Sequence, residues 1–250
     1  MNVCRRVVSA TLLLSLSIVA TAGDKSKPKE MAAKNVDSGS FGVFVNGQRV
    51  ATETFSIQQG PAGSIATAQF KTEAGSQSQS ALSADMEMTP AGDLTKYEWK
   101  ELSPGQARAS VMPSNDFLTE RIVKGPKEKP EEQPFMLPAS TSILDDYFFS
   151  HRQILVWRFL ATACKQESGQ VKCPANQKTL FGALNPQQRA AMQVSLEFTG
   201  RDKAKVRGNE QEFNRFILKS DGGDWIMWVD DQFKLQRILM ESEHTEVIRD

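Results

Sequence analysis

The 250-residue sequence is poor in the residues from which most catalytic and metal sites are built. It has only two histidines and three cysteines, and it lacks both the Gly-X-Ser-X-Gly motif of many hydrolases and a phosphate-binding loop ending in Gly-Lys-Ser/Thr. A site that needs more than two histidines is therefore excluded. We expect no catalytic residue, no metal ion and no cofactor. The remaining enzymatic alternative is a hydrolase whose catalytic residues belong to no recognisable motif.

The few motifs that suggest chemistry have simpler interpretations. Asp37-Ser38-Gly39 matches the triplet of aspartic proteases, but no second triplet supplies the partner carboxylate that such a site requires. We interpret His151 as a half-buried helical residue and His244 as a surface residue. Acidic turns that lack the spacing of a calcium-binding loop are explained by turn chemistry; they contain Asp221, Asp224, Asp230 and Asp231.

The sequence also lacks long hydrophobic runs, except at its beginning. Arg5 and Arg6 precede an apolar stretch from Val7 to Ala20, and small residues follow it at Ala20-Thr21-Ala22. This pattern predicts a secretory signal peptide over residues 1–22, and the run is short for a membrane span. We therefore expect an exported protein, periplasmic or secreted, with no transmembrane segment in the mature chain.

Neither sign of charge dominates the chain. Lysine plus arginine and aspartate plus glutamate number 30 each, and loss of Arg5 and Arg6 with the signal peptide leaves a net charge of about −2. A near-neutral balance gives no electrostatic reason to expect a nucleic acid as partner.

Two cysteines, Cys164 and Cys173, remain in the mature chain and flank an eight-residue polar loop. In an oxidising compartment a local disulfide is the expected outcome. A metal site is the weaker alternative, because neither a second cysteine pair nor a nearby histidine completes the ligand set.

Asn46-Gly47 predicts a two-residue β-hairpin turn within residues 41–57. A regular register would place Val43 opposite Val50 and Phe41 opposite Thr52, with Phe44, Phe55 and Ile57 on the other face. Apolar residues then occupy both faces. Either a helix or second layer covers the further face, or the sheet curves around a hydrophobic ligand.

Beyond the signal peptide, residues 23–38 are polar and predict a flexible leader, and residues 39–250 predict a single β-rich domain. Short strands with regular turn signals from 39 to 124 suggest an antiparallel meander, and strand patterns return after the cysteine loop. The charged, proline-rich segment 124–138 predicts a solvated loop.

Residues 142–158 predict the main helix, with Ser142 as its cap and Asp145 and Asp146 at its positive end. The second half of this segment is apolar enough to form a buried strand instead. Near the end of the chain Trp225 and Ile226 again place apolar residues on both faces of one strand. The tryptophans form either core or a concave ligand surface; they are Trp99, Trp157, Trp225 and Trp228.

The segment from Gly42 to Phe55, with Phe44, Val50 and Glu53, resembles the opening of uncharacterised exported bacterial β-sheet proteins, a domain of unknown function. The stretch LDDYFFSHRQILVWR, the segment Leu184-Asn185-Pro186-Gln187 and the end of the chain are similar to the same group, so that the likeness spans residues 41–250. The layout resembles that of the lipoprotein-localisation carriers LolA and LolB. The resemblance implies a curved antiparallel sheet closed by helices around acyl chains. The single helix expected here departs from the larger helical lid of those carriers.

These observations predict a mainly β (α+β) domain, a curved antiparallel sheet or half-barrel with one packed helix. We expect a non-catalytic protein that binds a lipid or another hydrophobic small molecule in the cell envelope. The expected ligand-binding residues are Phe44, Phe55, Trp225 and Trp228. The alternative is a scaffold module that binds an envelope protein.

Overall fold

The computed structural model describes residues 33–75, 79–167 and 169–250, which belong to one compact unit. The expected signal peptide and residues 23–32 of the expected leader lie outside the described residues. The first strand begins at Lys34, so residues 34–38 of that leader are strand rather than flexible coil.

Strands make up most of the described chain, and one α-helix interrupts them. In chain order the elements are β1 (Lys34–Val45), β2 (Gln48–Gly60), β3 (Gly63–Thr72), β4 (Ala81–Met88), β5 (Leu94–Ser103), β6 (Arg108–Ser114), β7 (Phe117–Val123), β8 (Glu131–Phe135), β9 (Ser142–Ile143), α1 (Ser150–Ala163), β10 (Lys165–Glu167), β11 (Gln170–Lys172), β12 (Gln177–Asn185), β13 (Ala190–Val206), β14 (Asn209–Ser220), β15 (Gly223–Val229), β16 (Leu235–Met240), the 3₁₀ turn η1 (Glu241–Glu243) and β17 (Thr245–Arg249).

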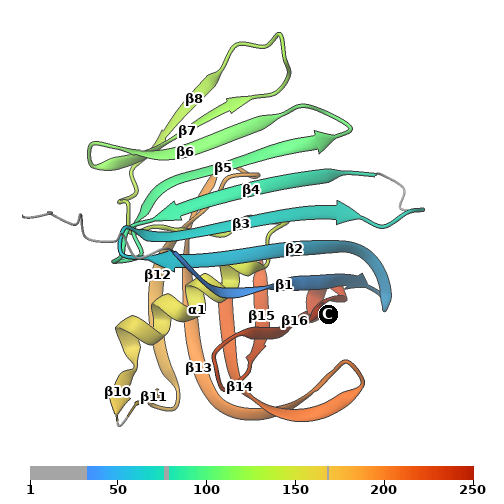
Figure 1. The fold of residues 1–250 in the computed structure, drawn as a ribbon, viewed down its shortest axis with the longest axis vertical. Coiled ribbons are helices and arrows are strands. Elements are labelled where there is room, and N and C mark those ends of the chain that lie inside the picture. The colour runs from blue at the N-terminus through green and yellow to red at the C-terminus, as the bar shows by residue number, and fades with distance from the viewer. Residues whose placement is uncertain (1–32, 76–78, 168) are drawn as a thin grey trace, which may run out of the picture. The chain divides into compact units, whose positions relative to one another are not determined.

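Fifteen of these strands form one continuous sheet in the order β8-β7-β6-β5-β4-β3-β2-β1-β17-β16-β15-β14-β13-β12-β9, and β10 and β11 form a separate hairpin. The first strand pairs with the last, so two meanders meet in the middle of the sheet. Every pairing is antiparallel except that of β9 with β12. The sheet curves around α1, as Figure 1 shows, which confirms the expected mainly β fold with one packed helix.

The turn at Asn46-Gly47 forms as its sequence predicts. Both residues have positive φ, 51° and 75°, which a type I′ hairpin turn requires. The pairing of Val45 with Gln48 next to the turn also agrees with the expected register. Local turn chemistry therefore decides this part of the fold.

Further from the turn the expected register is wrong. An irregularity between Val43 and Phe44 shifts the pairing by one residue, so that Val43 faces Ala51 and Phe41 faces Glu53. A one-residue shift exchanges the faces of a strand. Phe55 therefore lies in the core together with Phe41, and only Phe44 points to the other side. The doubled apolar face expected for this hairpin is thus removed by a β-bulge.

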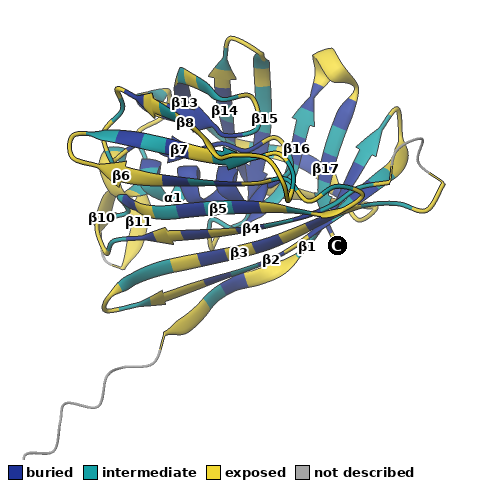
Figure 2. Ribbon diagram, turned by 90° about the horizontal axis from the view of Figure 1, so that it is seen from above, coloured by how far each residue is buried: buried dark blue, intermediate teal, exposed yellow. Residues whose placement is uncertain are grey.

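The main hydrophobic core lies on the concave side of the sheet, between the strands and α1. Figure 2 shows buried and exposed residues alternating along β3 and β4, as expected for strands with one buried face. The helix contributes Ile154, Leu155, Val156 and Phe159 to this core. The helix is therefore enclosed by the sheet rather than lying on its outside.

A second, smaller cluster lies on the opposite face of β15, β16 and β17. Trp228 is buried there against Ala204, Val206 and Phe213, which come from the far half of the long β13–β14 hairpin. An irregularity between Phe198 and Gly200 interrupts the regular pairing of that hairpin. The sheet thus covers part of its own outer face, and β15 has apolar residues on both faces as its sequence predicts.

The helix begins later than expected and ends later too. It spans Ser150–Ala163 rather than residues 142–158, because Ser142 and Ile143 pair with β12 and the Leu144 amide donates to the Leu184 carbonyl. Ser142 is not its cap, and its first turn contains no acidic residue. The apolar second half of the expected segment is helix and not strand.

Part of the expected 124–138 loop forms the edge strand β8. Its sequence EEQPF combines charge with Pro134, features that discourage pairing with another strand. Within the described residues no helix has the length and apolar character that a membrane span requires.

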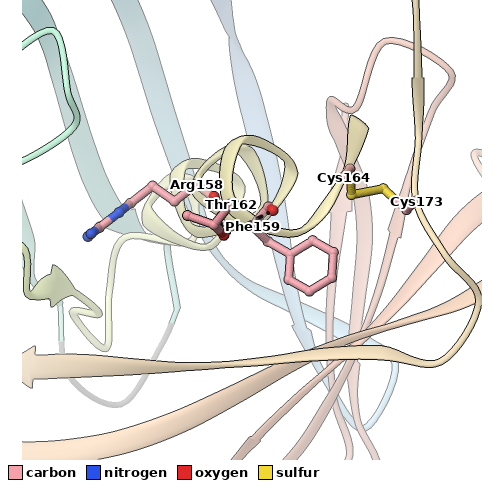
Figure 3. The surroundings of a disulfide bond; sticks show 5 residues. All are labelled: Arg158, Phe159, Thr162, Cys164 and Cys173. Atoms are coloured by element: carbon pink, nitrogen blue, oxygen red, sulfur yellow. Dashed lines mark hydrogen bonds between the residues drawn. A yellow bond between two sulfur atoms is a disulfide. The ribbon is translucent and has the colours of Figure 1, made fainter. Parts of the chain in front are cut away.

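The disulfide between Cys164 and Cys173 is present, with an S–S distance of 2.04 Å. Cys164 follows the last residue of α1, and the bond closes the β10–β11 hairpin, as Figure 3 shows. The disulfide expected from the sequence is therefore confirmed, and it fixes the hairpin that follows the helix.

Candidate functional site

The amino-terminus of α1 is capped by a carboxylate from a distant strand. Glu53 of β2 is fully buried and accepts hydrogen bonds from the Phe149 amide at 2.6 Å and from the Ser150 hydroxyl at 2.6 Å. These contacts satisfy donors that the first turn of a helix leaves free. Burial raises the pKa of Glu53 to about 7, although the same hydrogen bonds act to lower it.

A second buried carboxylate joins the helix to the first and last strands. Asp37 accepts hydrogen bonds from Arg249 at 2.6 and 3.0 Å and from the Gln153 amide at 2.6 Å, while the Lys234 ammonium lies 3.4 Å away. The Gln153 carbonyl oxygen in turn accepts from the Leu235 amide at 2.7 Å. Burial alone would raise the pKa of Asp37, but the hydrogen bonds from Arg249 and Gln153 outweigh it and lower the pKa.

A third network surrounds the segment that leads into the helix. Tyr97 donates to Asp145 at 2.7 Å, and Gln187 donates to the same carboxylate oxygen at 3.2 Å. Arg152 donates to the Asp145 backbone carbonyl, and its guanidinium lies 4.3 Å from the Trp225 ring. Burial raises the pKa of Asp145, and these donors act against that rise. Tyr97, Gln187 and Trp225 thus contact Asp145 or Arg152 and hold the start of the helix from three different parts of the fold.

Arg189 connects the two ends of the sheet. It lies in the turn between β12 and β13, with its Nε 3.6 Å from the fully buried Glu120 of β7. It also donates to Glu131 of β8 at 3.1 Å. Burial raises the pKa of Glu120 to about 7, since Arg189 compensates only partly. Ion pairs of Arg189, rather than backbone hydrogen bonds between strands, join the β12–β13 turn to β7 and β8.

His151 lies inside the core rather than half-buried as expected, with 3% of its surface exposed. Burial, together with Arg152, lowers the pKa of His151 to about 3, so the imidazole is neutral at physiological pH. Within the described chain neither its Nδ1 nor the Thr141 hydroxyl has a hydrogen-bond partner. Both residues line a small void of about 10 Å³ between the helix and β4.

An apolar groove of about 170 Å³ runs along the same side of α1. It lies between the helix, the ends of β1–β3 and the β4–β5 turn. The apolar residues that define it are Val36, Ile57, Met88, Ile154, Trp157 and Ala161. It shares Met88, Gly92, Ile154 and Arg158 with the small void, so the two spaces adjoin. The groove therefore opens at the surface and ends near two polar atoms.

Arg158 borders both spaces. It donates to the Ser142 hydroxyl at 2.8 Å and to the Ser140 carbonyl at 2.6 Å, and it is half-buried. Figure 3 shows Arg158 leaving the helix in a different direction from Phe159. Burial lowers the pKa of Arg158, and Asp93 acts in the opposite direction. Arg158 is thus the charged residue of a groove whose other lining residues are apolar or uncharged.

The four expected ligand-binding residues do not lie together. Phe55 is buried in the core and stacks on Phe41 with ring centroids 4.9 Å apart. Trp225 packs on the inner face against Arg152. Phe44 and Trp228 lie on the outer face, where Phe44 borders an open, largely charged depression. None of the four lines the groove, and their role in ligand binding stays a prediction.

Glu53 is a sequence signal for the polar network. Glu53 stands in β2 between Ala51 and Phe55, at a position whose neighbours two residues away are buried. An acidic residue on a core face needs a partner, since burying an unpaired charge is costly. Arg158 gives no comparable signal, because it fits an ordinary amphipathic helix, whereas Trp157 is one of the four tryptophans expected in either the core or a ligand surface.

The arrangement holds the start of α1 in place. The carboxylates of Glu53, Asp37 and Asp145 are each engaged by buried hydrogen-bond donors, and His151 is neutral and enclosed. Among the described residues no cluster of three or more histidine, cysteine, aspartate or glutamate side chains could hold a metal ion. The apolar groove lies beside this network.

Comparison with solved structures supports the β-sheet fold. No protein-family model matches the sequence, and no curated protein matches it significantly. Among solved structures, the fold is similar to a β-barrel-like protein of the domain of unknown function DUF1849 from Brucella abortus. The TM-score is 0.51 and the identity 7%, over 85% of this chain and 94% of that one. At this identity the likeness shows the fold alone: the chain has the architecture of a β-barrel-like domain of unknown function.

Proposed function

We propose that the protein binds a hydrophobic ligand, a lipid or another apolar molecule, in the groove beside α1, and that it catalyses no reaction. The groove is the observation that carries this proposal. Its walls come from Val36, Ile57, Ile154 and Trp157, and apolar walls with a few polar groups are typical of ligand sites.

The volume of the groove limits the size of the ligand that it can hold. Its volume of about 170 Å³ is smaller than the roughly 300–1,000 Å³ of most small-molecule pockets. One narrow chain fits such a space better than two chains side by side. The proposed ligand therefore has a single alkyl chain or a similarly slender apolar group.

The polar network supports a preformed site. Glu53 of β2 and Asp37 of β1 bind the amino-terminal half of α1 to the middle of the sheet, and Asp145, just before the helix, accepts a hydrogen bond from Tyr97 of β5. The groove walls contributed by the helix are thus held in position before a ligand arrives. A preformed wall reduces the conformational entropy lost on binding.

We further propose that the protein acts outside the cytoplasm, in the periplasm or after secretion. The disulfide between Cys164 and Cys173 is compatible with an oxidising compartment. The amino-terminal pattern at residues 1–22 is the sequence basis of this proposal.

The proposal is tested by filling the groove. Ala161 lines it and is exposed, whereas the neighbouring Thr162 is exposed and does not line it. Calorimetric titration with decanol should show binding to the wild type and to Thr162→Trp, and loss of about tenfold or more in affinity for Ala161→Trp, which corresponds to about 1.4 kcal/mol. Equal decanol affinities for all three proteins, or no binding at all, would reject the groove as the site.

A protein-interaction module is the second candidate, and one observation favours it. In the described residues β9 pairs with β12 only at Ala183 and Leu184, so the outer edge of β12 before Ala183 is open. Leu180 on this strand is 59% exposed. An open edge with an apolar side chain can accept a strand from a partner. A photo-crosslinker at position 180, but not at position 67 on β3, should then capture a single envelope protein in cells.

A further inference from the structure

Arg158 is a half-buried cation without an anionic partner nearby. Its two hydrogen bonds go to a hydroxyl and a backbone carbonyl, of Ser142 and Ser140, and neither group carries a charge. In the part of the chain that the structure describes, no carboxylate oxygen lies within 4.0 Å of its guanidinium nitrogens. Removing a charge from water without a counter-charge is unfavourable.

The guanidinium also has hydrogen-bonding capacity to spare. Arginine carries five N–H donors in a fixed planar fork, and the two contacts of Arg158 use one donor on each terminal nitrogen. Such a fork matches the geometry of a carboxylate or phosphate. An anion at the rim of the groove would therefore pair with the positive charge of Arg158 and accept hydrogen bonds from its free N–H donors.

The other polar groups at the groove do not supply that anion. The Thr141 hydroxyl and the His151 Nδ1 at its inner end have no partners within the described chain, and both are uncharged. Asp93 influences Arg158 only from beyond ion-pair distance. Gln59, Ser64 and Thr89 also line the groove and are uncharged, and the rest of its wall is mostly apolar. A ligand that complements the groove thus needs an apolar body and one negative charge.

We propose that the groove beside α1 takes a single-chain anionic amphiphile, with its alkyl chain against Ile57, Ile154 and Trp157 and its anionic headgroup paired with Arg158. This inference rests on the proposed function and names the class of its ligand. The shared chemistry is one alkyl chain with one carboxylate or phosphate, as in a free fatty acid or a lysophospholipid. A two-chained lipid exceeds the volume of the groove.

The test compares two probes of equal chain length that differ in charge. Delipidated wild-type protein is titrated by calorimetry with decanoate and with decanol. Arg158→Gln removes the charge, Arg158→Lys keeps it without the fork, and Arg121→Gln removes an exposed arginine of β7 as a matched control. The decanoate titrations are repeated at low and high salt.

The wild type and Arg121→Gln should bind decanoate at least about tenfold more tightly than decanol, because a hydrogen bond to a charged group is about twice as strong as a neutral one. Arg158→Gln should lose this preference, because its decanoate affinity falls much more than its decanol affinity, and Arg158→Lys should keep part of it. The wild-type preference should weaken at high salt.

Equal affinity of the wild type for the two probes overturns the headgroup inference and leaves the groove proposal standing. A loss of decanol and decanoate affinity alike in Arg158→Gln also overturns it, because it would show that Arg158 only supports the fold. Failure of the wild type to bind either probe rejects the proposed function itself. Extraction of the purified protein followed by mass spectrometry then distinguishes a fatty acid from a lysophospholipid.

Discussion

Replacing Glu53 with glutamine should make the folded protein more stable at neutral pH and change how its stability depends on pH. The pKa of this carboxyl rises from 4.5 to about 7 on folding, mainly because it is buried. Each pKa unit corresponds to about 1.4 kcal/mol, so the ionised form is disfavoured by roughly 3 kcal/mol in the folded state. Glutamine removes that cost and can still accept from the Phe149 amide.

The sign of the pH dependence of stability follows from proton binding by Glu53. Between pH 4.5 and about 7 the folded state keeps the Glu53 proton while the unfolded chain releases it. The stability linked to this group is fully present below pH 4.5 and is lost as the pH rises to about 7. Urea unfolding from pH 4.5 to 8 should therefore show the wild type losing about 3 kcal/mol more than Glu53→Gln over this range.

Glu132→Gln, on the exposed edge strand β8, is the matched control and should follow the wild-type curve. Parallel curves for the wild type and Glu53→Gln would refute the reasoning. A wild type that gains stability relative to Glu53→Gln as the pH rises would contradict its sign. Glu53→Ala, which loses the cap at every pH, separates the capping contribution from the titration.

Three further predictions concern the disulfide, the core network and the outer face. Replacing both Cys164 and Cys173 with serine should lower the free energy of unfolding by about 2.5–3 kcal/mol, because the bond closes a short loop; urea titration under non-reducing conditions measures it, and an unchanged midpoint would contradict it. Tyr97→Phe should lower the free energy of unfolding by about 1–3 kcal/mol, because the buried Asp145 carboxylate loses a hydrogen-bond donor. An unaltered free energy of unfolding in the same titration would contradict this. Phe44→Ala and Trp228→Ala should leave decanol affinity unchanged, since neither residue lines the groove; a loss of affinity in either variant would place the ligand on the outer face.

Features set by neighbouring residues could be predicted from the sequence. The turn at Asn46-Gly47 follows from the positive φ that these residues tolerate. The disulfide follows from two cysteines nine positions apart. The two apolar faces of β15 follow from alternation at Trp225 and Ile226, although the sequence could not show that the β13–β14 hairpin covers the outer one.

Features set by distant residues could not be predicted. The start of α1 depends on Glu53, 96 positions before the Phe149 amide it accepts from, so the local capping signal at Ser142 was misleading. The bulge beside Val43 occurs in β1 where that strand pairs with both β2 and β17. Its one-residue shift moved Phe55 into the core and removed it from the surface where a ligand was expected.

The groove gave no signal in the sequence for a related reason. Its walls come from β1, β2, the β4–β5 turn and α1, which are distant along the chain. Apart from Trp157, which the sequence leaves open as core or ligand surface, each wall residue taken alone looks like a core or helix residue. The site exists only because the sheet curves until its strands meet the helix.

Native mass spectrometry of the protein purified without detergent tests the central claim most directly. The wild type is expected to carry one single-chain amphiphile per protein, solvent extraction to remove this mass, and Ala161→Trp purified in the same way to lack it. A wild type that shows only the mass of the chain with its Cys164–Cys173 bond, or an identical added mass on Ala161→Trp, would contradict binding in the groove.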